Sequence, residues 1–304
     1  MCGLVGLHLR PGPAERGGRP VLEDRLGDLL GQMLIAMTTR GPDSSGAAIY
    51  RDATSGVHKV SVLAPIEIDW PALEADLALL VAAGVSVAGC GDVAIIETSA
   101  TPHSVANALA AIAPELIVIG AGESIEVFKR VGHASALTGA YGLDARSGFQ
   151  GIGHTRMATE SAVTTAHSHP FAPGRDVALA HNGSFSNYAT VRRRLEHQGV
   201  AFDTDNDSEV AARLIAQQLA AGEDLRSAID TVASRMDGFY TLLVATNDEF
   251  AVVRDAFACK PAVIAETDDY VAMASEYHAL TSLPGIADAE VYEPKPSEVY
   301  LWKR

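Results

Sequence analysis

Residues 2–9 have the sequence CGLVGLHL, a short apolar run that contains two glycines. Runs of this length and composition are typical of a buried β-strand. Cys2 follows the initiator Met1 directly and opens this run. The chemistry open to a cysteine at that place governs the interpretation of the remaining sequence.

Removal of Met1 would leave Cys2 with a thiol and a free α-amine on one residue. A thiol of pKa near 8.5 is a poor nucleophile at neutral pH unless a base takes its proton. An α-amine of pKa about 7.7–8.0 is suited to being that base, directly or through one water. Cys2 is therefore a candidate nucleophile that carries its own base. On position alone, a small apolar residue at the start of a strand is the simpler interpretation.

The next segments predict a helix and a turn. Apolar residues recur at intervals of three and four over residues 22–37, after a loop at 11–20 that is rich in Pro and Gly. This spacing is typical of one face of an amphipathic helix. The helix is expected to end at Arg40-Gly41-Pro42-Asp43, a cluster of turn-forming residues, and 47–50 predicts a strand.

Residues 57–122 differ in composition from the preceding segment: they are rich in Ala and Val and contain few clusters of turn-forming residues. Their periodicity predicts strands at 59–63, 85–89, 93–98 and 115–120, with helices at 71–83 and 102–113. The resulting order, βαββαβ, is the split βαβ arrangement of ferredoxin-like modules.

The second half of the chain predicts further strands around two helices. The expected strands cover 124–131, 151–156, 239–245, 250–254, 262–265, 270–274 and 298–302, and the helices cover 208–221 and 225–236. A strand and helix at the start, central helices and a late run of strands predict an α+β layered protein with a two-sheet core.

Five short segments match one known family in its own order. They are Cys2-Gly3-Leu4-Val5-Gly6, 40–46 (RGPDSSG), 151–159 (GIGHTRMAT), His181-Asn182-Gly183 and Asp207-Ser208-Glu209. With these segments the chain resembles the class II glutamine amidotransferases, whose glutaminase domains use an N-terminal cysteine. Each match alone is weak, but five in order, beginning at residue 2, are specific.

The resemblance covers about residues 2–50 and 124–280, and it implies a particular fold. That fold is α+β, the four-layered αββα arrangement of N-terminal nucleophile hydrolases. We therefore expect a glutaminase domain made of residues 2–56 and 123–304, interrupted by an inserted βαββαβ, ferredoxin-like subdomain at 57–122.

The resemblance also implies a glutamine site. A planar guanidinium can bind the α-carboxylate of glutamine with two hydrogen bonds, the role of the position matching Arg156. A carboxylate neutralises the α-ammonium, and Asp207 matches that position. Attack on the side-chain amide creates an oxyanion, which needs donors about 2.7–3.1 Å away. The side-chain amide of Asn182 and the backbone N–H of Gly183 match that pair.

Four neighbouring residues complete the expected site. Thr159 matches a position that helps to hold the substrate carboxylate, whereas Glu160 stands where some relatives have His. A glutamate there would repel the carboxylate unless it turns away or pairs with a cation. Arg40 and Asp43 are expected to brace the loop around Cys2 rather than to act in catalysis.

Three other motifs have simpler explanations. His167-Ser168-His169 lacks a nearby acidic or cysteine ligand, so it is not expected to bind metal. Asp203, Asp205 and Asp207 alternate like part of a calcium loop but lack its glycine and terminal glutamate. Gly120-Ala121-Gly122 lacks the third glycine of a dinucleotide fingerprint and predicts a turn. Cys90 and Cys259 are expected in the core.

Composition limits the partners and the location. The 304 residues carry a net charge of −15, which disfavours nucleic acid and anionic lipid as partners. No apolar stretch reaches the ~20 residues of a membrane span, and no secretory signal is visible. Three cysteines cannot form a disulfide framework. We therefore expect a cytoplasmic protein.

The glutaminase fold and the insertion use nearly all of the chain, so the ammonia acceptor is expected on another polypeptide. The residues of these motifs most resemble those of stand-alone amidotransferase subunits of glutamate-synthase-like systems, such as N-methylglutamate synthase. That resemblance implies L-glutamine as substrate, a hetero-oligomer with synthase subunits, and no cofactor in this chain, any flavin belonging to a partner. Two alternatives stay open: a non-catalytic glutamine-sensing regulatory subunit, and an N-terminal-cysteine hydrolase of another amide.

Overall fold

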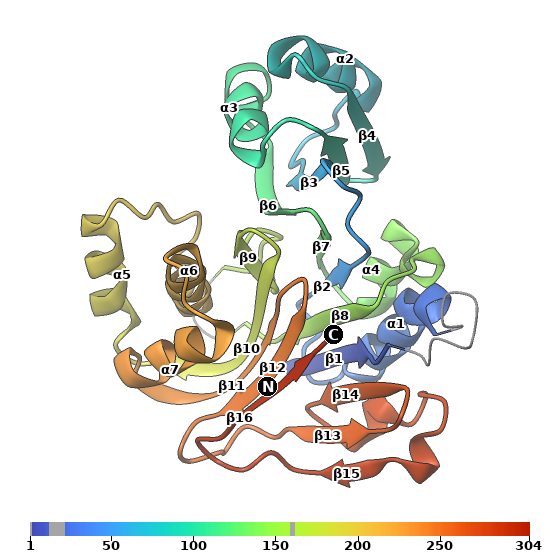
Figure 1. The fold of residues 1–304 in the computed structure, drawn as a ribbon, viewed down its shortest axis with the longest axis vertical. Helices are drawn as coiled ribbons and strands as arrows, with labels where there is room; N and C mark the ends of the chain where they lie inside the picture. Colours follow the sequence, from blue (N-terminus) through green and yellow to red (C-terminus); the bar gives the residue numbers. More distant parts are fainter. Residues whose placement is uncertain (1, 12–21, 159–161) are drawn as a thin grey trace.

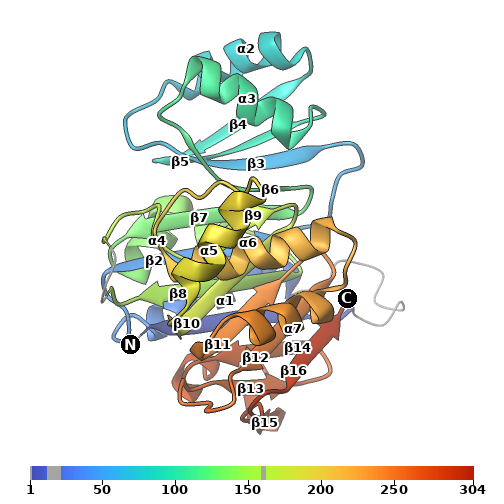
Figure 2. The same ribbon diagram turned by 90° about the vertical axis from the view of Figure 1, so that its left-hand side faces the viewer.

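The computed structural model describes residues 2–11, 22–158 and 162–304. In this part of the chain the strands form three antiparallel sheets, which the helices cover (Figure 1). The expected α+β class is confirmed. Two of the sheets lie face to face in the body of the molecule, and the third projects from it at one end (Figures 1 and 2).

The first sheet contains the N-terminal strand near its centre. Within the described residues it has seven strands in the order β15-β13-β14-β1-β8-β2-β7. Their bounds are β1 Gly3–Leu9, β2 Ser44–Tyr50, β7 Ile125–Val131, β8 Gln150–Arg156, β13 Val263–Glu266, β14 Tyr270–Ala274 and β15 Glu290–Tyr292. Helices α1 (Leu26–Ala36) and α4 (Ala134–Tyr141) pack on its outer face. The predicted strand and helix at the start of the chain are confirmed.

The second sheet carries the other half of the site. Counted over the described residues, it has five strands in the order β16-β12-β11-β10-β9. Their bounds are β9 Phe171–Gly174, β10 Val177–Phe185, β11 Gly238–Ala245, β12 Glu249–Arg254 and β16 Val299–Lys303. Helix α6 (Asp207–Ala220) packs on β9 and β10, and α5 (Tyr188–His197) and α7 (Leu225–Arg235) pack against α6.

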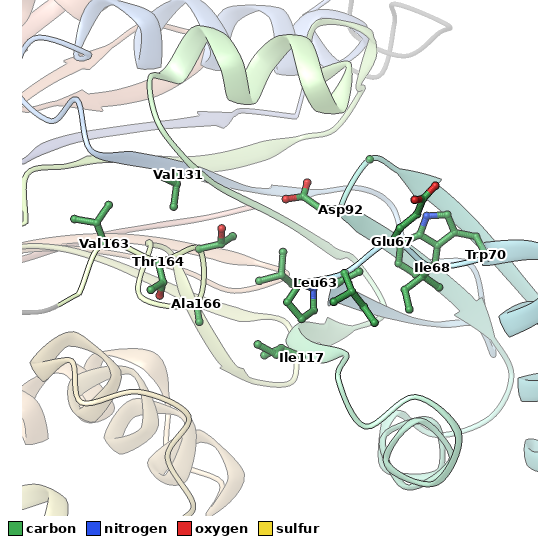
Figure 3. Close-up of a pocket in the computed structure, with 15 residues that line it drawn as sticks. Leu63, Glu67, Ile68, Trp70, Asp92, Ile117, Val131, Val163, Thr164 and Ala166 are labelled. Atoms are coloured by element: carbon green, nitrogen blue, oxygen red, sulfur yellow. The ribbon is translucent and has the colours of Figure 1, made fainter.

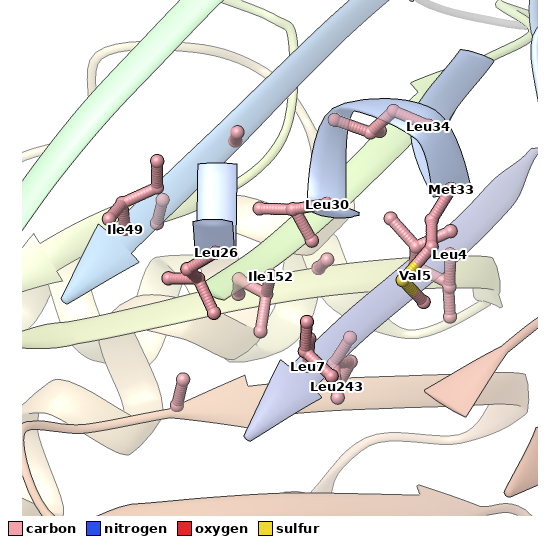
Figure 4. Close-up of a cluster of buried hydrophobic side chains, with 14 of the residues drawn as sticks. Leu4, Val5, Leu7, Leu26, Leu30, Met33, Leu34, Ile49, Ile152 and Leu243 are labelled. Atoms are coloured by element: carbon pink, nitrogen blue, oxygen red, sulfur yellow. The ribbon is translucent and has the colours of Figure 1, made fainter. Parts of the chain in front are cut away.

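One hydrophobic cluster joins α1, the first sheet and the inner face of the second sheet. Leu26, Leu30, Met33 and Leu34 of α1 point onto β1, β2 and β8, while Leu243 reaches the cluster from the second sheet (Figure 4). All five side chains are fully buried. Replacing one such leucine by alanine costs about 2–5 kcal/mol of folding free energy. This cluster therefore fixes the two sheets, and the strands that carry the site, against each other.

The third sheet has the element order that the sequence predicts for residues 57–122. It is formed by β3 (His58–Leu63), β4 (Val85–Cys90), β5 (Val93–Thr98) and β6 (Ile117–Gly122), in the order β4-β5-β3-β6. Helices α2 (Trp70–Val81) and α3 (Pro102–Ile112) cover one face. Each helix begins at a capping side chain followed by proline: Asp69 accepts from Ala72 N at 3.1 Å, and Thr101 from Ser104 N at 3.2 Å.

The glycines at 120–122 do not form the turn that the sequence predicts. Strand β6 runs through Gly122, and the chain turns only at 123–124. A β-carbon on Gly122 would lie 2.0 Å from the Asp176 carboxylate, which accepts hydrogen bonds from the backbone N–H groups of 123–125. Because Gly122 has no side chain, the Asp176 carboxylate can approach and hold the turn at 123–124, directly after the strand.

Several elements have no counterpart among the sequence predictions. They are α4, β9, β10, α5 and β15. The most consequential is β10, which brings Asn182 and Gly183 to the site. No helix in the described segments is both long and apolar enough to cross a membrane.

Candidate active site

Cys2 stands at the entrance to β1, next to the end of β8. Its Sγ accepts a hydrogen bond from Met157 N at 3.5 Å, and its carbonyl oxygen accepts from Arg40 Nε at 3.0 Å and Asn182 Nδ2 at 3.2 Å. Burial raises the pKa of the Cys2 thiol, while the Met157 N–H and the positive charges of Arg156 and Lys260 act in the opposite direction. The thiol therefore needs both a base and these positive charges to react at neutral pH.

The backbone around Cys2 is held by close contacts. Leu4 N donates to Ser275 Oγ, and Ser275 N donates to Leu4 O, both at 2.9 Å. A β-carbon at Gly3 would lie 2.7 Å from Thr155 Oγ1 and 2.8 Å from Met37 Cβ. Only glycine fits this approach of β1 to its neighbours, which explains the residue that follows the cysteine.

Asn182 and Gly183 lie side by side on β10, facing Cys2. Asn182 is almost fully buried, and its side-chain amide lies within hydrogen-bonding distance of the Cys2 carbonyl. A β-carbon on Gly183 would lie 2.1 Å from Phe239 O and 2.7 Å from Tyr240 Cα, on the paired strand β11. Any larger residue would push β10 away from β11, so this site requires glycine.

Asp207 is the first residue of α6 and is tied to the end of β10. Its Oδ2 accepts a hydrogen bond from Phe185 N at 2.9 Å, and its Oδ1 accepts from Ser208 Oγ at 3.2 Å. Asn206 caps the helix by accepting from Ser208 N at 2.9 Å. These hydrogen bonds hold the Asp207 carboxylate in one orientation at the N-terminus of α6, where the helix dipole favours negative charge.

The loop before Asp207 is fixed by Glu209, the last residue of the same motif. Its carboxylate accepts from Asp203 N at 2.9 Å and Thr204 N at 2.7 Å, and pairs with Arg213 Nε at 2.6 Å. These bonds and the Arg213 charge keep the pKa of Glu209 below its ordinary value although burial raises it. Glu209 thus positions the loop that ends at Asp207.

Arg156 is the last residue of β8 and lines the same cavity as Cys2 and Asp207. Its Nη1 donates to Ala162 O at 2.9 Å. Burial lowers the pKa of Arg156, and the charges of Cys2, Asp43 and Asp207 oppose that effect. A guanidinium stays protonated in such surroundings, so it places a permanent positive charge beside the thiol.

Arg40 and Asp43 support this region from outside. Arg40 Nη1 pairs with Glu276 at 2.5 Å, while its Nε reaches the Cys2 carbonyl. Asp43 Oδ2 accepts from Ala158 N at 2.8 Å, and Asp43 N donates to Arg156 O at 3.1 Å. Neither residue is among the described residues that line the cavity below.

Five of the residues that the sequence singles out line one cavity of about 430 Å³. They are Cys2, Arg156, Asn182, Gly183 and Asp207. The predicted Thr159, and Glu160 beside it, lie outside the described residues. The cavity, called here the active-site cavity, joins a thiol, two amide donors, a cation and an anion that come from β1, β8, β10 and α6.

The active-site cavity is also lined by residues that the sequence analysis did not assign to the site, among them Tyr188, Phe239 and Lys260. Lys260 is the most notable, because its ammonium lies 5.1 Å from the Phe239 ring centroid and the ion pairs of the described residues include none to it. The Lys260 carbonyl accepts a hydrogen bond from Thr241 Oγ1 at 3.0 Å, and Thr241 of β11 is paired with Asn182 of β10. Nothing local in the sequence indicates this location.

Three buried histidines lie together at the active-site cavity, and His169 and His181 line it. The rings of His154 and His169 are 4.1 Å apart, and those of His169 and His181 are 6.4 Å apart. Burial lowers the pKa of all three, that of His154 to about 3. They are therefore neutral at pH 7 and add no positive charge to the site.

The two motifs with metal-like spacing separate in space. His167 Nε2 lies 2.8 Å from Asp205 Oδ1, whereas His169 stacks in the histidine cluster. Asp203 pairs with Arg213 at 2.5 Å, away from the partners of Asp205 and Asp207. In the described part of the chain, no group of three or more His, Cys, Asp or Glu side chains is arranged to hold a metal ion.

The prediction that Cys259 is a core residue is wrong, because Cys259 is exposed. Cys90 is partly buried and packs against the edge of the main hydrophobic cluster. Cys259 lies between β12 and β13, in a loop where the chain leaves one sheet for the other. Apolar neighbours in sequence do not imply burial there, because the loop runs over the surface.

Comparisons with known proteins agree with this geometry. A family model described as a glutamine amidotransferase domain matches residues 154–282. The "Glutamine amidotransferase-like protein GlxB" of Rhizobium meliloti (strain 1021) is 48% identical over 99% of this chain and 98% of its own length. A "Putative glutamine amidotransferase" of Methanothermobacter thermautotrophicus is 31% identical over 99% of both chains.

Among solved structures, glutamine phosphoribosylpyrophosphate amidotransferase from B. subtilis has a TM-score of 0.63 at 19% identity. The match covers 99% of this chain and 47% of that chain. This likeness shows that the two chains share a fold. Two relatives match this chain along nearly their whole length, and the family model matches it as well. The chain therefore belongs to the class II glutamine amidotransferase family and is an enzyme of that class.

Proposed function

We propose that this protein is the glutaminase subunit of a glutamine amidotransferase and that it hydrolyses L-glutamine through a Cys2 γ-glutamyl thioester. The observation that carries the proposal is the convergence of Cys2, Asn182, Gly183, Arg156 and Asp207 on one cavity of about 430 Å³. A thiol alone would suit many reactions. A thiol beside an oxyanion site, a fixed cation and a fixed anion suits an α-amino acid with a side-chain amide.

The proposed architecture follows the same family. The two facing sheets with helices on their outer faces correspond to the four-layered αββα arrangement, formed by residues 2–56 and 123–304. Residues 57–122, which make the third sheet and its two helices, are the inserted subdomain. The close pairing of β2 with β7, on either side of this segment in the sequence, supports the division.

Substrate binding uses two charged residues that line the cavity. Arg156 binds the α-carboxylate with its planar guanidinium, and Asp207 binds the α-ammonium. This pair selects an α-amino acid over a simple amide. Thr159 is proposed to add a hydrogen bond to the carboxylate.

The first chemical step needs removal of Met1. The freed α-amine of Cys2 takes the thiol proton, and the thiolate attacks the γ-carbonyl carbon of glutamine. The Asn182 side-chain amide and the Gly183 N–H donate to the resulting oxyanion. As the carbon–nitrogen bond breaks, the α-ammonium returns its proton to the leaving group, which departs as ammonia.

The second step hydrolyses the thioester. Water attacks the same carbon while the Cys2 α-amine takes a proton, the oxyanion donors act again, and glutamate leaves as the thiol re-forms. All of these groups belong to the polypeptide, so we propose that hydrolysis uses no cofactor bound to this chain.

Ammonia is then proposed to pass to a separate synthase subunit in a glutamate-synthase-like hetero-oligomer. In support, the relatives matched along their whole length are named only as glutamine amidotransferases. The amidophosphoribosyltransferase of Methanocaldococcus jannaschii is different, because this chain covers 40% of it. The resemblance of the sequence motifs supports a system of the N-methylglutamate synthase type.

The test is labelling with the glutamine analogue 6-diazo-5-oxo-L-norleucine, followed by intact-mass and peptide analysis. We expect one adduct, on Cys2, in a chain that has lost Met1. The Cys259→Ala variant should label like the wild type, and Cys2→Ala should not label. Retained Met1, or an adduct on Cys90 or Cys259, would overturn the proposal. Glutaminase assays with and without co-purified chains from the native source then test the partner.

A further inference from the structure

A second cavity, about 840 Å³ in volume, lies where the third sheet meets the body of the molecule. One wall is the segment from β3 to Trp70, at the start of α2; the opposite wall includes 163–166 and Val131 (Figure 3). We call it the Trp70 cavity. Its volume falls within the range of about 300–1,000 Å³ that is usual for small-molecule sites.

The walls of the Trp70 cavity hold apolar side chains that water reaches. Ile66 is 56% exposed, Val163 is 46% exposed and Val131 is 43% exposed. They come from three distant parts of the sequence and line one hollow, with Val131 and Val163 at one end and Trp70 at the other (Figure 3). Apolar side chains gathered around a hollow in this way mark a binding site more often than scattered ones do.

The charged groups of the Trp70 cavity all have one sign. Its described lining contains Glu67 and Asp92 but no Lys, Arg or His. Asp92 Oδ1 accepts from Tyr141 Oη at 2.7 Å and from Arg130 Nη1 at 3.3 Å, so its carboxylate is held in place and partly neutralised. Glu67 is exposed and forms no ion pair with any described residue. The nearby cation, Arg130, is already paired with Asp92, so the described lining offers a carboxylate or phosphate ligand no unpaired cation.

We propose that the Trp70 cavity binds an organic ammonium ion: an apolar or aromatic body that carries one positive charge. The body would pack on Ile66 and the Trp70 indole, whose face also attracts cations. The ammonium would lie toward Glu67 and Asp92. A free amino acid is a poor ligand in this site, because its carboxylate would have no cationic partner.

The test compares three ligands of one shape: phenethylamine, L-phenylalanine and 3-phenylpropionate. They share a phenyl ring and a two-carbon chain and differ in which charged groups they carry. Isothermal titration calorimetry on the unmodified chain measures all three. We expect phenethylamine to bind at least about tenfold more tightly than 3-phenylpropionate, with L-phenylalanine also weaker than the amine. Equal affinity for amine and carboxylate, or no binding by the amine at millimolar concentration, would overturn the proposal.

Variants locate the bound amine. Glu67→Gln should weaken phenethylamine binding about two- to fivefold, because a partly exposed ion pair contributes modestly. Asp76→Asn is the matched control, since Asp76 is an exposed carboxylate of α2, the helix that follows Glu67, and does not line the cavity. Equal losses in both variants would point to the general negative charge of the protein and contradict the proposed site.

Tryptophan fluorescence tests independently where phenethylamine binds. The chain has two tryptophans, and Trp302 belongs to β16, away from the Trp70 cavity. In a Trp302→Phe chain only Trp70 emits, so bound phenethylamine should shift or quench that emission at the concentrations where calorimetry detects heat. Saturated binding without a change in Trp70 emission would place the amine elsewhere.

Discussion

The active-site cavity is about half the volume of the Trp70 cavity, 430 Å³ against 840 Å³, yet every proposed reactive group lies in the smaller one. Its walls are strand ends and a helix start, held by the packing of two sheets. The walls of the Trp70 cavity are mainly loop segments and partly exposed apolar side chains. Volume shows where the chain leaves space, whereas reactivity requires opposite charges and donors held at fixed positions.

The largest expected effect is the loss of the nucleophile. Cys2→Ala should lower glutaminase turnover by at least about a thousandfold, because no other group in the cavity can form the thioester. Glutamate release by the purified chain measures it. Cys259→Ala removes an exposed thiol and should leave turnover unchanged. More than a tenth of wild-type activity in Cys2→Ala would contradict the assignment.

The oxyanion donor gives the next largest effect. Asn182→Ala should cut kcat about a hundredfold or more, since one such donor contributes about 2.7–4 kcal/mol to transition-state stabilisation. The KM for glutamine should change little, because the donor acts mainly after attack. Steady-state kinetics separate the two constants. A rise in KM at constant kcat would instead assign Asn182 to substrate binding.

Lys260 tests whether positive charge in the active-site cavity activates the thiol. Its charge lowers the pKa of Cys2, so Lys260→Met should raise that pKa. Below the thiol pKa, each unit of increase lowers the thiolate fraction about tenfold, and the difference should vanish at high pH. The rate of alkylation by iodoacetamide against pH measures it, with Lys260→Arg keeping the wild-type profile. Identical profiles for wild type and Lys260→Met would exclude this role.

The smallest effect separates the two cavities. Ile66→Ser changes a half-exposed side chain of the Trp70 cavity and should leave glutamine kcat/KM within about twofold of wild type. The same variant should weaken phenethylamine binding by removing apolar contact. If Ile66→Ser instead lowers glutaminase activity strongly, the two cavities are coupled and the contrast between them fails.

Local elements were largely within reach of the sequence. The apolar spacing of 22–37 predicts α1, and the periodicity of 57–122 predicts each strand and helix of the third sheet in order. These signals depend on which side chains of a single element are buried, so residues close together in the sequence are enough to reveal them. The candidate site residues came from the resemblance of five short motifs to a family, not from periodicity.

Strand β10 shows the limit of local signals. Its apolar start at Val177 gives way to His181-Asn182-Gly183-Ser184, so no alternation marks it as a strand. It forms because β11 pairs along its whole length and α6 covers it. The exposure of Cys259 has the same origin, since burial depends on where a loop crosses the surface.

The sequence by itself indicated the candidate nucleophile, most of the elements and the motifs that resemble a family. Only the tertiary structure decided that Cys2, Arg156, Asn182 and Asp207 share one cavity, that Lys260 joins them, and that a second cavity opens beside Trp70. The physical reason is distance along the chain. Periodicity reports burial within a few turns or strand residues, whereas a site is formed by contacts between segments many residues apart, which the packing of two sheets selects.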